Sequence, residues 1–487
     1  MSGYEEIIKD LFSRHQSVQN AGFTSDSYKP GLERIRELDE RMGYPSTQFR
    51  SVHVAGTNGK GSVCSLLAAS LAASGYRVGL FTSPHLLDFR ERIKIVQGQG
   101  SRMIPRDNVL EFLERFDSPS LSFFEITTGM AFWYFALEKV DIAVVEVGLG
   151  GLLDSTNILE PEIAVVTSIG LDHCALLGNT RAEIAVQKAG IFKCGVPAVV
   201  GERDPETEPV FEAAAAFAHC PLFFAEQFMG QDCLECVEPV SGQEYLVEKC
   251  DKDRLDAEST FPPSSPDPGD TPDPGDTLAP SDVILSGAKD LVARMDLKGE
   301  YQADNLRTVL CVLELLGEDP QWDALCHAAA ITGLRGRWEK VSDRPLTIAD
   351  IGHNPAALRR NFAQLEDMMA TGAYDRLIVI YGVMADKDLD GIIPLMPRAA
   401  EYFFVTPDTP RALPATDILE RFQAVTIGAG APSGVIMSEA KDLPAAEACP
   451  SVADAHRRAL AAASPHSLIY VGGSTFVVAD YLKLLQV

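Results

Sequence analysis

Short apolar runs alternate with helical patterns along most of this chain. In its first half, apolar runs of strand length cover residues 77–82, 141–147, 163–168 and 196–201. Helical patterns occupy residues 4–12, 32–42, 107–116, 125–137 and 181–188. In the second half, strand-length runs return at residues 346–350, 376–381, 402–406, 424–427 and 468–471. Strands that alternate with helices predict parallel, doubly wound sheets, so we expect an α/β protein.

A glycine-rich segment follows the first β-branched run. It consists of Gly56, Thr57, Asn58, Gly59, Lys60, Gly61 and Ser62. An alanine- and leucine-rich stretch of helical period comes next, so the order is strand, glycine loop, helix. This is the context of a phosphate loop, whose N–H groups and helix N-terminus bind phosphate oxygens while a lysine reaches a terminal phosphate. The spacing departs from G-x-x-x-x-G-K-[ST], so the motif alone leaves an ordinary glycine-rich turn open.

Net charge and composition narrow the classes of partner. The 487 residues include 69 acidic and 42 basic side chains, and the formal net charge of −27 argues against a nucleic-acid or anionic-membrane partner. We see no signal-peptide centre and no apolar run that could span a bilayer. The ten cysteines are scattered, which favours reduced thiols and a cytoplasmic protein. For the lone C-x-x-C pair of Cys233 and Cys236 we expect no metal or redox role.

One segment has the composition of an insert. Residues 251–282 are rich in Pro, Asp, Ser and Gly and contain a tandem Pro-Asp-Pro-Gly-Asp-Thr repeat, so we expect them to be disordered. Residues 223–247, just before, are expected to supply short antiparallel strands. Residues 283–291 recur almost unchanged at 435–443, and we assign no function to either copy.

Polar residues follow three of the predicted strands. Ser83 comes directly after the run at 77–82, Glu146 is the last residue but one of the run at 141–147, and His173 follows the third run. The carboxyl ends of parallel strands lie along one edge of a sheet, where the phosphate loop also opens. We therefore expect Ser83, Glu146 and His173 to hold one magnesium ion beside a triphosphate.

Several motifs lie along the chain in the order found in a known family. They lie at residues 56–62, 82–86, 89–93, 124–128, 146–157, 172–173 and 187–191. Together they resemble the folylpolyglutamate synthase/dihydrofolate synthase family of the Mur ligase superfamily, over nearly the whole chain outside the insert. The resemblance implies that Ser83, Glu146 and His173 bind Mg²⁺ and that Lys188 is carbamylated, which turns a cation into an anionic oxygen ligand. The pattern alone would make Lys188 a solvated helix lysine.

The resemblance also implies a nucleotide site shared by two domains. Residues 299–305 match a family helix whose asparagine, here Asn305, contacts the nucleotide, although Tyr301 stands where a histidine is usual. Residues 333–339 mark a hinge, so we expect an ATP-binding domain over residues 1–334 and a Rossmann-like domain over 335–487.

The second domain would complete that site. By the resemblance, Asp350 would hydrogen-bond the ribose, and Arg337 and His353 would reach the phosphates as the cleft closes. Ile351 and Gly352 replace the family's Gly-Ala between them. Without the family resemblance, a helix cap is an equally good interpretation of Asp350, and a residue of a capping turn is an equally good interpretation of His353.

The acceptor pocket is implied by the same motifs. Its expected lining is the stretch 83–92, with Pro84 and His85, and the loop around Phe123, Phe124, Leu153, Asp154 and Ser155, since aromatic faces suit a flat heterocycle. Residues 386–388 and 410–412 also match family stretches, and we expect them to form second-domain structure and the glutamate pocket, where Arg411 would bind the carboxylate.

The implied reaction is amide formation driven by ATP. The enzyme would add L-glutamate to tetrahydrofolate, and to dihydropteroate, through an acyl phosphate, with release of ADP and phosphate. Lys60, Glu146, His173 and Lys188 would carry the chemistry with Mg²⁺, and no protein nucleophile is needed. We expect a monomer whose partners are these small molecules.

Two alternatives stay open. A Mur-type ligase acting on a nucleotide-linked wall precursor expects a domain of about a hundred residues before the phosphate loop, and that domain is missing here. A phosphate-loop binding module without ligase chemistry would need neither the motif at 187–191 nor a second domain bearing Asp350 and His353.

Leu152 generates a first prediction, because it replaces an arginine that is usual in the Gly-Leu-Gly-Gly-Arg stretch. We expect this chain to keep its activity with an altered folate affinity, since a possible anchor for the acceptor is lost. Leu152→Arg should therefore change the folate KM in steady-state assays, and an unchanged folate KM would refute the prediction.

Overall fold

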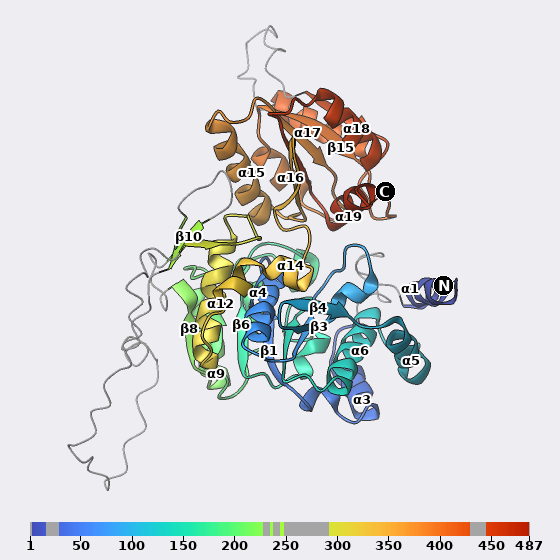
Figure 1. The fold of residues 1–487 in the computed structure, drawn as a ribbon, viewed down its shortest axis with the longest axis vertical. Helices are drawn as coiled ribbons and strands as arrows, with labels where there is room; N and C mark the ends of the chain where they lie inside the picture. The colour runs from blue at the N-terminus through green and yellow to red at the C-terminus, as the bar shows by residue number, and fades with distance from the viewer. Residues whose placement is uncertain are drawn as a thin grey trace, which may run out of the picture.

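The computed structural model describes residues 2–15, 29–226, 234–236, 244–247, 292–428 and 445–486. The insert at 251–282, both near-copied segments and Cys233 lie outside this part. Two large sheets occupy separate halves of the molecule (Figure 1). In the described residues no helix combines the length and apolarity needed to cross a membrane.

The first sheet has eight strands in the order β4-β3-β2-β5-β1-β6-β7-β8. Their bounds are β1 Arg50–Ala55, β2 Val78–Phe81, β3 Ile93–Gln97, β4 Gly100–Met103, β5 Ile142–Glu146, β6 Ile163–Val166, β7 Ala198–Val200 and β8 Leu222–Phe224. The six strands from β2 to β8 pair in parallel, and β3 and β4 add an antiparallel edge. All four strands predicted in the first half are confirmed; the antiparallel edge was not predicted.

Helices cover both faces of this sheet. They are α1 Ser2–Arg14, α3 Glu33–Arg41, α4 Lys60–Ala73, α5 Arg106–Phe116, α6 Phe123–Leu137, α7 Cys174–Leu177, α8 Arg181–Ala189, α9 Glu208–Ala218, α12 Gln302–Leu316, α13 Trp322–Cys326 and α14 Ala328–Thr332. Helix α4 is apolar all round and almost completely buried, because the sheet covers one side and α12, α13 and α14 cover the other. The helix that begins at the phosphate loop is thus fixed on all sides.

A small antiparallel sheet has the order β11-β10-β9. Its strands are β9 Leu234–Cys236, β10 Glu244–Val247 and β11 Val292–Arg294. The short antiparallel strands expected within residues 223–247 are therefore present as β9 and β10, whereas β8 belongs to the large parallel sheet.

The second large sheet has the order β12-β13-β17-β14-β15-β16, parallel except for β12. The strands are β12 Glu339–Asp343, β13 Leu346–Asp350, β14 Leu377–Tyr381, β15 Ala400–Val405, β16 Ala446–Cys449 and β17 Leu468–Gly472. The helices are α15 Pro355–Ala370, α16 Leu389–Ile392, α17 Ala415–Gly428, α18 Val452–Ala462 and α19 Thr475–Leu484.

One predicted strand is wrong. Residues 424–427 form the end of α17, and the edge strand of this sheet is β16. Ile418, Phe422 and Val425 recur at helical spacing and pack into one core cluster, so the short apolar run continues a helix face.

The two halves meet around Asp172, which follows β6. Lys387 Nζ donates to Asp172 Oδ1 at 2.7 Å, and His353 Nε2 and Asn354 Nδ2 lie 3.3 and 3.4 Å from Oδ2. Burial on its own raises the pKa of Asp172, but His353, His173 and Lys387 outweigh it and hold the pKa well below its usual value. A charged carboxylate of the first half is therefore tied to three side chains of the second.

This junction can be tested with Asp172→Asn. The change keeps the shape but leaves the largely buried Lys387 ammonium without its counter-charge, which typically costs about 3 kcal/mol. We expect a clearly lower thermal midpoint by calorimetry or circular dichroism. Asp343→Asn is the matched control, because the ion pair of Asp343 with Lys340 is exposed and should contribute nothing measurable. Equal midpoints for the two variants would contradict the assignment.

Candidate active site

The glycine loop turns sharply between β1 and α4. Gly56 and Gly59 have φ angles of 148° and 87°, which favour glycine. Thr57 N donates to Ser168 O at 2.7 Å and fixes the loop to the end of β6. Lys60 Nζ donates to the carbonyl oxygens of Gly56 and Thr57 at 3.0 and 3.1 Å. The ammonium thus lies on its own loop, where a phosphate oxygen can replace a carbonyl as its acceptor.

The first turn of α12 supports this loop from behind. A Cβ atom on Gly59 would lie only 2.2 Å from Asn305 Oδ1, so the position has no room for a side chain. Asn305 Nδ2 donates to Gln302 Oε1 at 2.8 Å, and Gln302 Nε2 donates to Ser62 Oγ at 3.2 Å. Asn305 therefore lies against the phosphate loop, and its contact with a nucleotide stays a prediction.

Ser83, Glu146 and His173 lie at the carboxyl ends of β2, β5 and β6, along one edge of the sheet. Ser83 N donates to Glu146 Oε2 at 3.1 Å. Burial raises the pKa of the Glu146 carboxyl, against the opposing effect of Lys60. Burial also lowers the pKa of His173 to about 3, so its imidazole is a neutral donor at neutral pH.

Lys188 lies in the last turn of α8 and points at the same loop. Its Nζ donates to Gly56 O at 2.8 Å, and the residue is only 4% exposed. The interpretation as a solvated helix lysine is therefore wrong. Burial, with the nearby Lys60 ammonium, lowers the pKa of Lys188 to about 7. At neutral pH a large fraction of this amine is uncharged and nucleophilic.

Arg337 brings a cation from the chain that leads into the second sheet. Its Nη2 lies 3.3 Å from the position that a Cβ atom on Gly61 would take, and Glu146 Oε2 lies 3.6 Å from the same position. A side chain at Gly61 would thus occupy the space between guanidinium and carboxylate. The arrangement places Arg337 at the N-terminus of α4, beside the expected phosphates.

Asp350, the last residue of β13, is fully engaged with protein donors. Its Oδ2 accepts from the Tyr301 hydroxyl and from Trp338 N, both at 2.8 Å. Its Oδ1 accepts from Gly352 N and Asn361 Nδ2, both at 2.7 Å. A ribose hydroxyl would have to displace one of these four donors. The ribose contact stays a prediction, and the observed geometry makes Asp350 a link between α12 and the second sheet.

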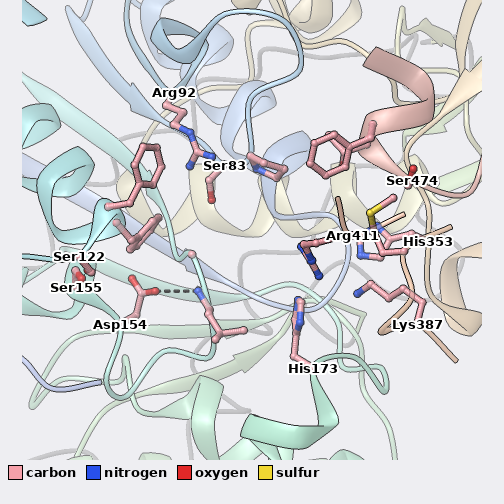
Figure 2. A pocket seen from close by; sticks show the side chains of 18 of the residues that line it. Ser83, Arg92, Ser122, Asp154, Ser155, His173, His353, Lys387, Arg411 and Ser474 are labelled. Carbon is pink, nitrogen blue, oxygen red and sulfur yellow. Dashed lines mark hydrogen bonds between the residues drawn. The ribbon is translucent and has the colours of Figure 1, made fainter. Parts of the chain in front are cut away.

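A cavity runs between the two halves (Figure 2). Ser122 and Asp154 lie at one end, Ser83 near the middle, and His353 and Lys387 at the other end. The predicted residues that line it are Ser83, Pro84, Phe124, Leu153, Asp154, Ser155, His173, His353 and Arg411. Residues from both halves of the chain therefore face one space.

His85 is not among the lining residues, in contrast to our expectation. Its Nδ1 accepts from Arg92 Nε at 2.9 Å, and its ring packs against Phe12 and Phe89. It holds Arg92, which does line the cavity and whose guanidinium lies 5.3 Å from the Phe123 ring centroid. Burial lowers the pKa of Arg92 to about 10, so it still carries its charge at neutral pH.

Asp154 and Arg411 already have partners within the protein. The Asp154 carboxylate accepts from Leu149 N at 2.8 Å, drawn dashed in Figure 2, and from Thr156 N at 3.0 Å. Arg411 Nη2 donates to Asp386 Oδ1 at 2.6 Å. Both side chains still face the cavity, so their substrate contacts stay predictions.

Lys29 and Ser474 line the cavity but were not predicted to do so. Arg92 and Lys387 line it as members of the stretches 83–92 and 386–388, which were expected at the acceptor and glutamate pockets. Lys29 lies in no motif, and its position follows only from the fold.

A divalent cation suits this donor set. No three His, Cys, Asp or Glu side chains gather into a metal cluster in the ranges that the structure describes. The expected magnesium ligands Ser83, Glu146 and His173 would not form such a cluster, because they combine a hydroxyl, one carboxylate and one imidazole. The buried Glu146 carboxylate and the neutral His173 ring fit a cation, which would compensate the buried negative charge.

Comparisons with known proteins show the family of this chain. The Mur ligase middle domain matches residues 54–227, and the Mur ligase, glutamate ligase domain matches residues 336–475. The chain is 32% identical over 430 residues to the dihydrofolate synthase/folylpolyglutamate synthase of Bacillus subtilis, covering 84% of this chain and 89% of that one. It is 30% identical over 462 residues to a probable bifunctional folylpolyglutamate synthase/dihydropteroate synthase of Haloferax volcanii, covering 93% of this chain and 48% of that protein.

Among solved structures, one similar protein is a bifunctional folylpolyglutamate synthase/dihydrofolate synthase from Yersinia pestis, complexed with AMPPNP and Mn ion. The similarity covers 99% of this chain and 98% of that one. Its TM-score is 0.72 and its identity 26%. The resemblance and the α/β fold predicted from the motifs are confirmed. This chain belongs to the dihydrofolate synthase/folylpolyglutamate synthase family of Mur ligases.

Proposed function

We propose that this protein is an ATP-dependent ligase that joins the amine of L-glutamate to a carboxylate of a folate acceptor, tetrahydrofolate or dihydropteroate. The observation that carries the proposal is the meeting of the phosphate loop, the Ser83–Glu146 pair and Arg337 beside Gly61 at the N-terminus of α4, in a chain of this family. Of these residues, Ser83 also lines the cavity. The alternative of a binding module without ligase chemistry accounts for neither Lys188 on the loop nor Arg337 above it.

The reaction needs two transfers in one closed space. The acceptor carboxylate takes the terminal phosphoryl group of ATP, and ADP leaves. The glutamate amine then attacks the acyl carbon, phosphate leaves, and the amine loses a proton. Lys60 and Arg337 neutralise charge on the transferring group, while the junction at Asp172 holds the two halves together and limits access of water to the acyl phosphate.

Ser83, Glu146 and His173 would hold Mg²⁺ in this proposal. The ion supplies charge neutralisation and orientation of the phosphates. Asn305, Asp350 and His353 complete the nucleotide site from the other elements.

The acceptor lies at the end of the cavity formed by Phe124, Leu153 and Ser155, and the glutamate lies toward Arg411 and Lys387. Aromatic and apolar walls suit a flat heterocycle at the first end. Basic side chains suit an amino acid carboxylate at the second end.

We also propose that Lys188 is carbamylated. Its amine is buried, partly uncharged, and only 2.8 Å from Gly56 O. Reaction of the uncharged amine with CO₂ forms an N–C bond and releases one proton. It leaves an anion next to Lys60 that attracts the Lys60 ammonium. We further propose that the protein acts as a cytoplasmic monomer, with domains over residues 1–334 and 335–487.

ADP release tests the ligase. With ATP, Mg²⁺ and glutamate present, dihydropteroate and tetrahydrofolate are offered in parallel, and we expect ADP only when an acceptor and glutamate are both supplied. Lys60→Met should lower the rate at least about 100-fold, since the phosphoryl group loses its cation. Turnover with a nucleotide-linked wall precursor, and with neither folate, would assign the chain to another Mur ligase.

The pKa of Lys188 gives a prediction with a definite sign. After removal of CO₂, reactivation at a fixed CO₂ concentration should be fast above pH 7 and should slow about tenfold per pH unit below it, because only the uncharged amine reacts. Lys188→Met should be at least about 100-fold slower in ADP release at any CO₂ concentration. A variant with the parent's rate, or reactivation independent of pH, would rule out the modification.

A further inference from the structure

Lys94 is a buried cation of the first half that the proposed reaction does not use. It lies in β3, is 7% exposed, and is the register partner of Leu80 in β2. Its Nζ donates to Thr332 O at 2.7 Å and, more weakly, to Gly333 O at 3.4 Å. Thr332 is the last residue of α14, which packs against α4, β3 and β4 (Figure 1). The ammonium therefore holds the point at which the chain leaves the first half.

The electrostatic surroundings of Lys94 do not favour a charge. Burial lowers the pKa of Lys94, and the charge of Glu91 opposes this only in part. The Glu91 carboxylate itself accepts from the backbone N–H groups of residues 86–88. A buried ammonium whose partners are uncharged carbonyl oxygens is costly compared with an apolar side chain of similar size. Stability alone therefore gives little reason for a lysine at this position.

The segment that begins at these carbonyl oxygens connects α14 with β12. It consists of residues 333–338, and we call it the linker. Its far end is held by the second half, because Ile351 N donates to Gly336 O at 3.0 Å. Trp338 N also donates to Asp350 Oδ2 at 2.8 Å. The linker is thus fixed by the second sheet at one end and by the β3 ammonium at the other.

Arg337 stands inside the linker, and its side chain depends on the linker backbone. Its Nη1 lies 3.3 Å from both Arg335 O and Gly336 O, so the side chain folds back on the linker. Its Nη2 faces the N-terminus of α4, 3.3 Å from the position of a Cβ atom on Gly61. A shift of the linker would therefore move the guanidinium relative to the phosphate loop.

We propose that Lys94 is a positioning residue for phosphoryl transfer: by holding the start of the linker against the first sheet, it keeps the Arg337 guanidinium at the N-terminus of α4. The inference rests on the proposed ligase function, in which Arg337 neutralises charge on the transferring group. Strand β2, which pairs with β3, ends shortly before Ser83. The same two strands therefore place the expected Mg²⁺ ligand and, through Lys94, the linker that carries the cation.

The alternative is that Lys94 only supplies a donor for the carbonyl oxygens at the end of α14. Its removal would then lower the stability of the fold and have no specific effect through Arg337. A double-mutant cycle between Lys94 and Arg337 separates the two roles. The readout is the initial rate of ADP formation from ATP, with glutamate and the folate acceptor that the parent turns over.

Lys94→Met keeps the length of the side chain and removes the ammonium. We expect kcat to fall about tenfold, because a displaced cation loses part of its effect on the transition state. The KM values for the acceptor and glutamate should stay within about twofold of the parent's. In the Arg337→Met background the same change should alter kcat by less than about twofold, since the group that Lys94 positions is gone.

Two further variants complete the design. Lys94→Arg should keep kcat within about threefold of the parent's, because a guanidinium can also donate to both carbonyl oxygens. Lys340→Met removes a lysine from an exposed ion pair in β12 and is the matched control, with kcat unchanged. Thermal midpoints are recorded for every variant, and rates are compared well below the lowest of them. Should Lys94→Met fail to fold, Lys94→Gln takes its place in the cycle, because its neutral amide is shorter and leaves the carbonyl contact incomplete.

Equal factors of loss in the parent and in the Arg337→Met background would mean that Lys94 acts on the fold alone. That result, or a Lys94→Arg rate as low as that of Lys94→Met, would overturn the inference while the ligase function stands. A parent protein that forms no ADP with either folate acceptor would overturn the proposed function and this inference with it.

Discussion

Two lysines share one carbonyl oxygen at the centre of this protein. Lys60 and Lys188 both donate to Gly56 O, at 3.0 and 2.8 Å, so their nitrogens cannot be more than about 6 Å apart. At an effective dielectric constant near 20, two unit charges at that separation repel by about 3 kcal/mol. Burial, and in addition the Lys60 charge, lower the pKa of Lys188 to about 7, so the site relieves part of this repulsion by releasing the Lys188 proton. Phosphate oxygens or a carbamate would compensate the remaining positive charge. The two lysines at the loop therefore favour the binding of anions.

The same loop is where the two halves of the chain meet. Asn58 and Asn354 exchange side-chain hydrogen bonds at 3.0 and 3.3 Å, next to the cluster around Asp172. On the other side, Tyr301 reaches Asp350 from the helix turn that supports Gly59. A nucleotide on the loop therefore touches elements whose other contacts hold the second half in place. Binding energy at the phosphates and closure of the cavity are coupled through these few polar contacts.

The residues at the edge of the first sheet could be predicted from the sequence, because a strand and the polar residue at its end are recognised within a short stretch of chain. The strand runs were long enough to place Ser83 and Glu146 at neighbouring carboxyl ends, and the backbone of one does contact the other. What it missed depends on contacts between distant segments. The burial of Lys188 and the position of Lys29 depend on how distant segments pack, and the hydrophobic periodicity of the sequence does not show this. The prediction of a strand at 424–427 failed for a different reason, since so short an apolar run fits the end of a helix as well as a strand.

Tyr301 shows how a departure from a family pattern can keep a contact and change its chemistry. An imidazole at this position would donate to Asp350 in a way that varies with its own protonation near neutral pH. The tyrosine hydroxyl does not, because burial, reinforced by the Asp350 charge, holds the pKa of Tyr301 well above its usual value. The proton therefore stays on the donor across the physiological range. The link between α12 and β13 then depends on geometry alone, and a change of pH that would loosen a histidine contact leaves this one intact.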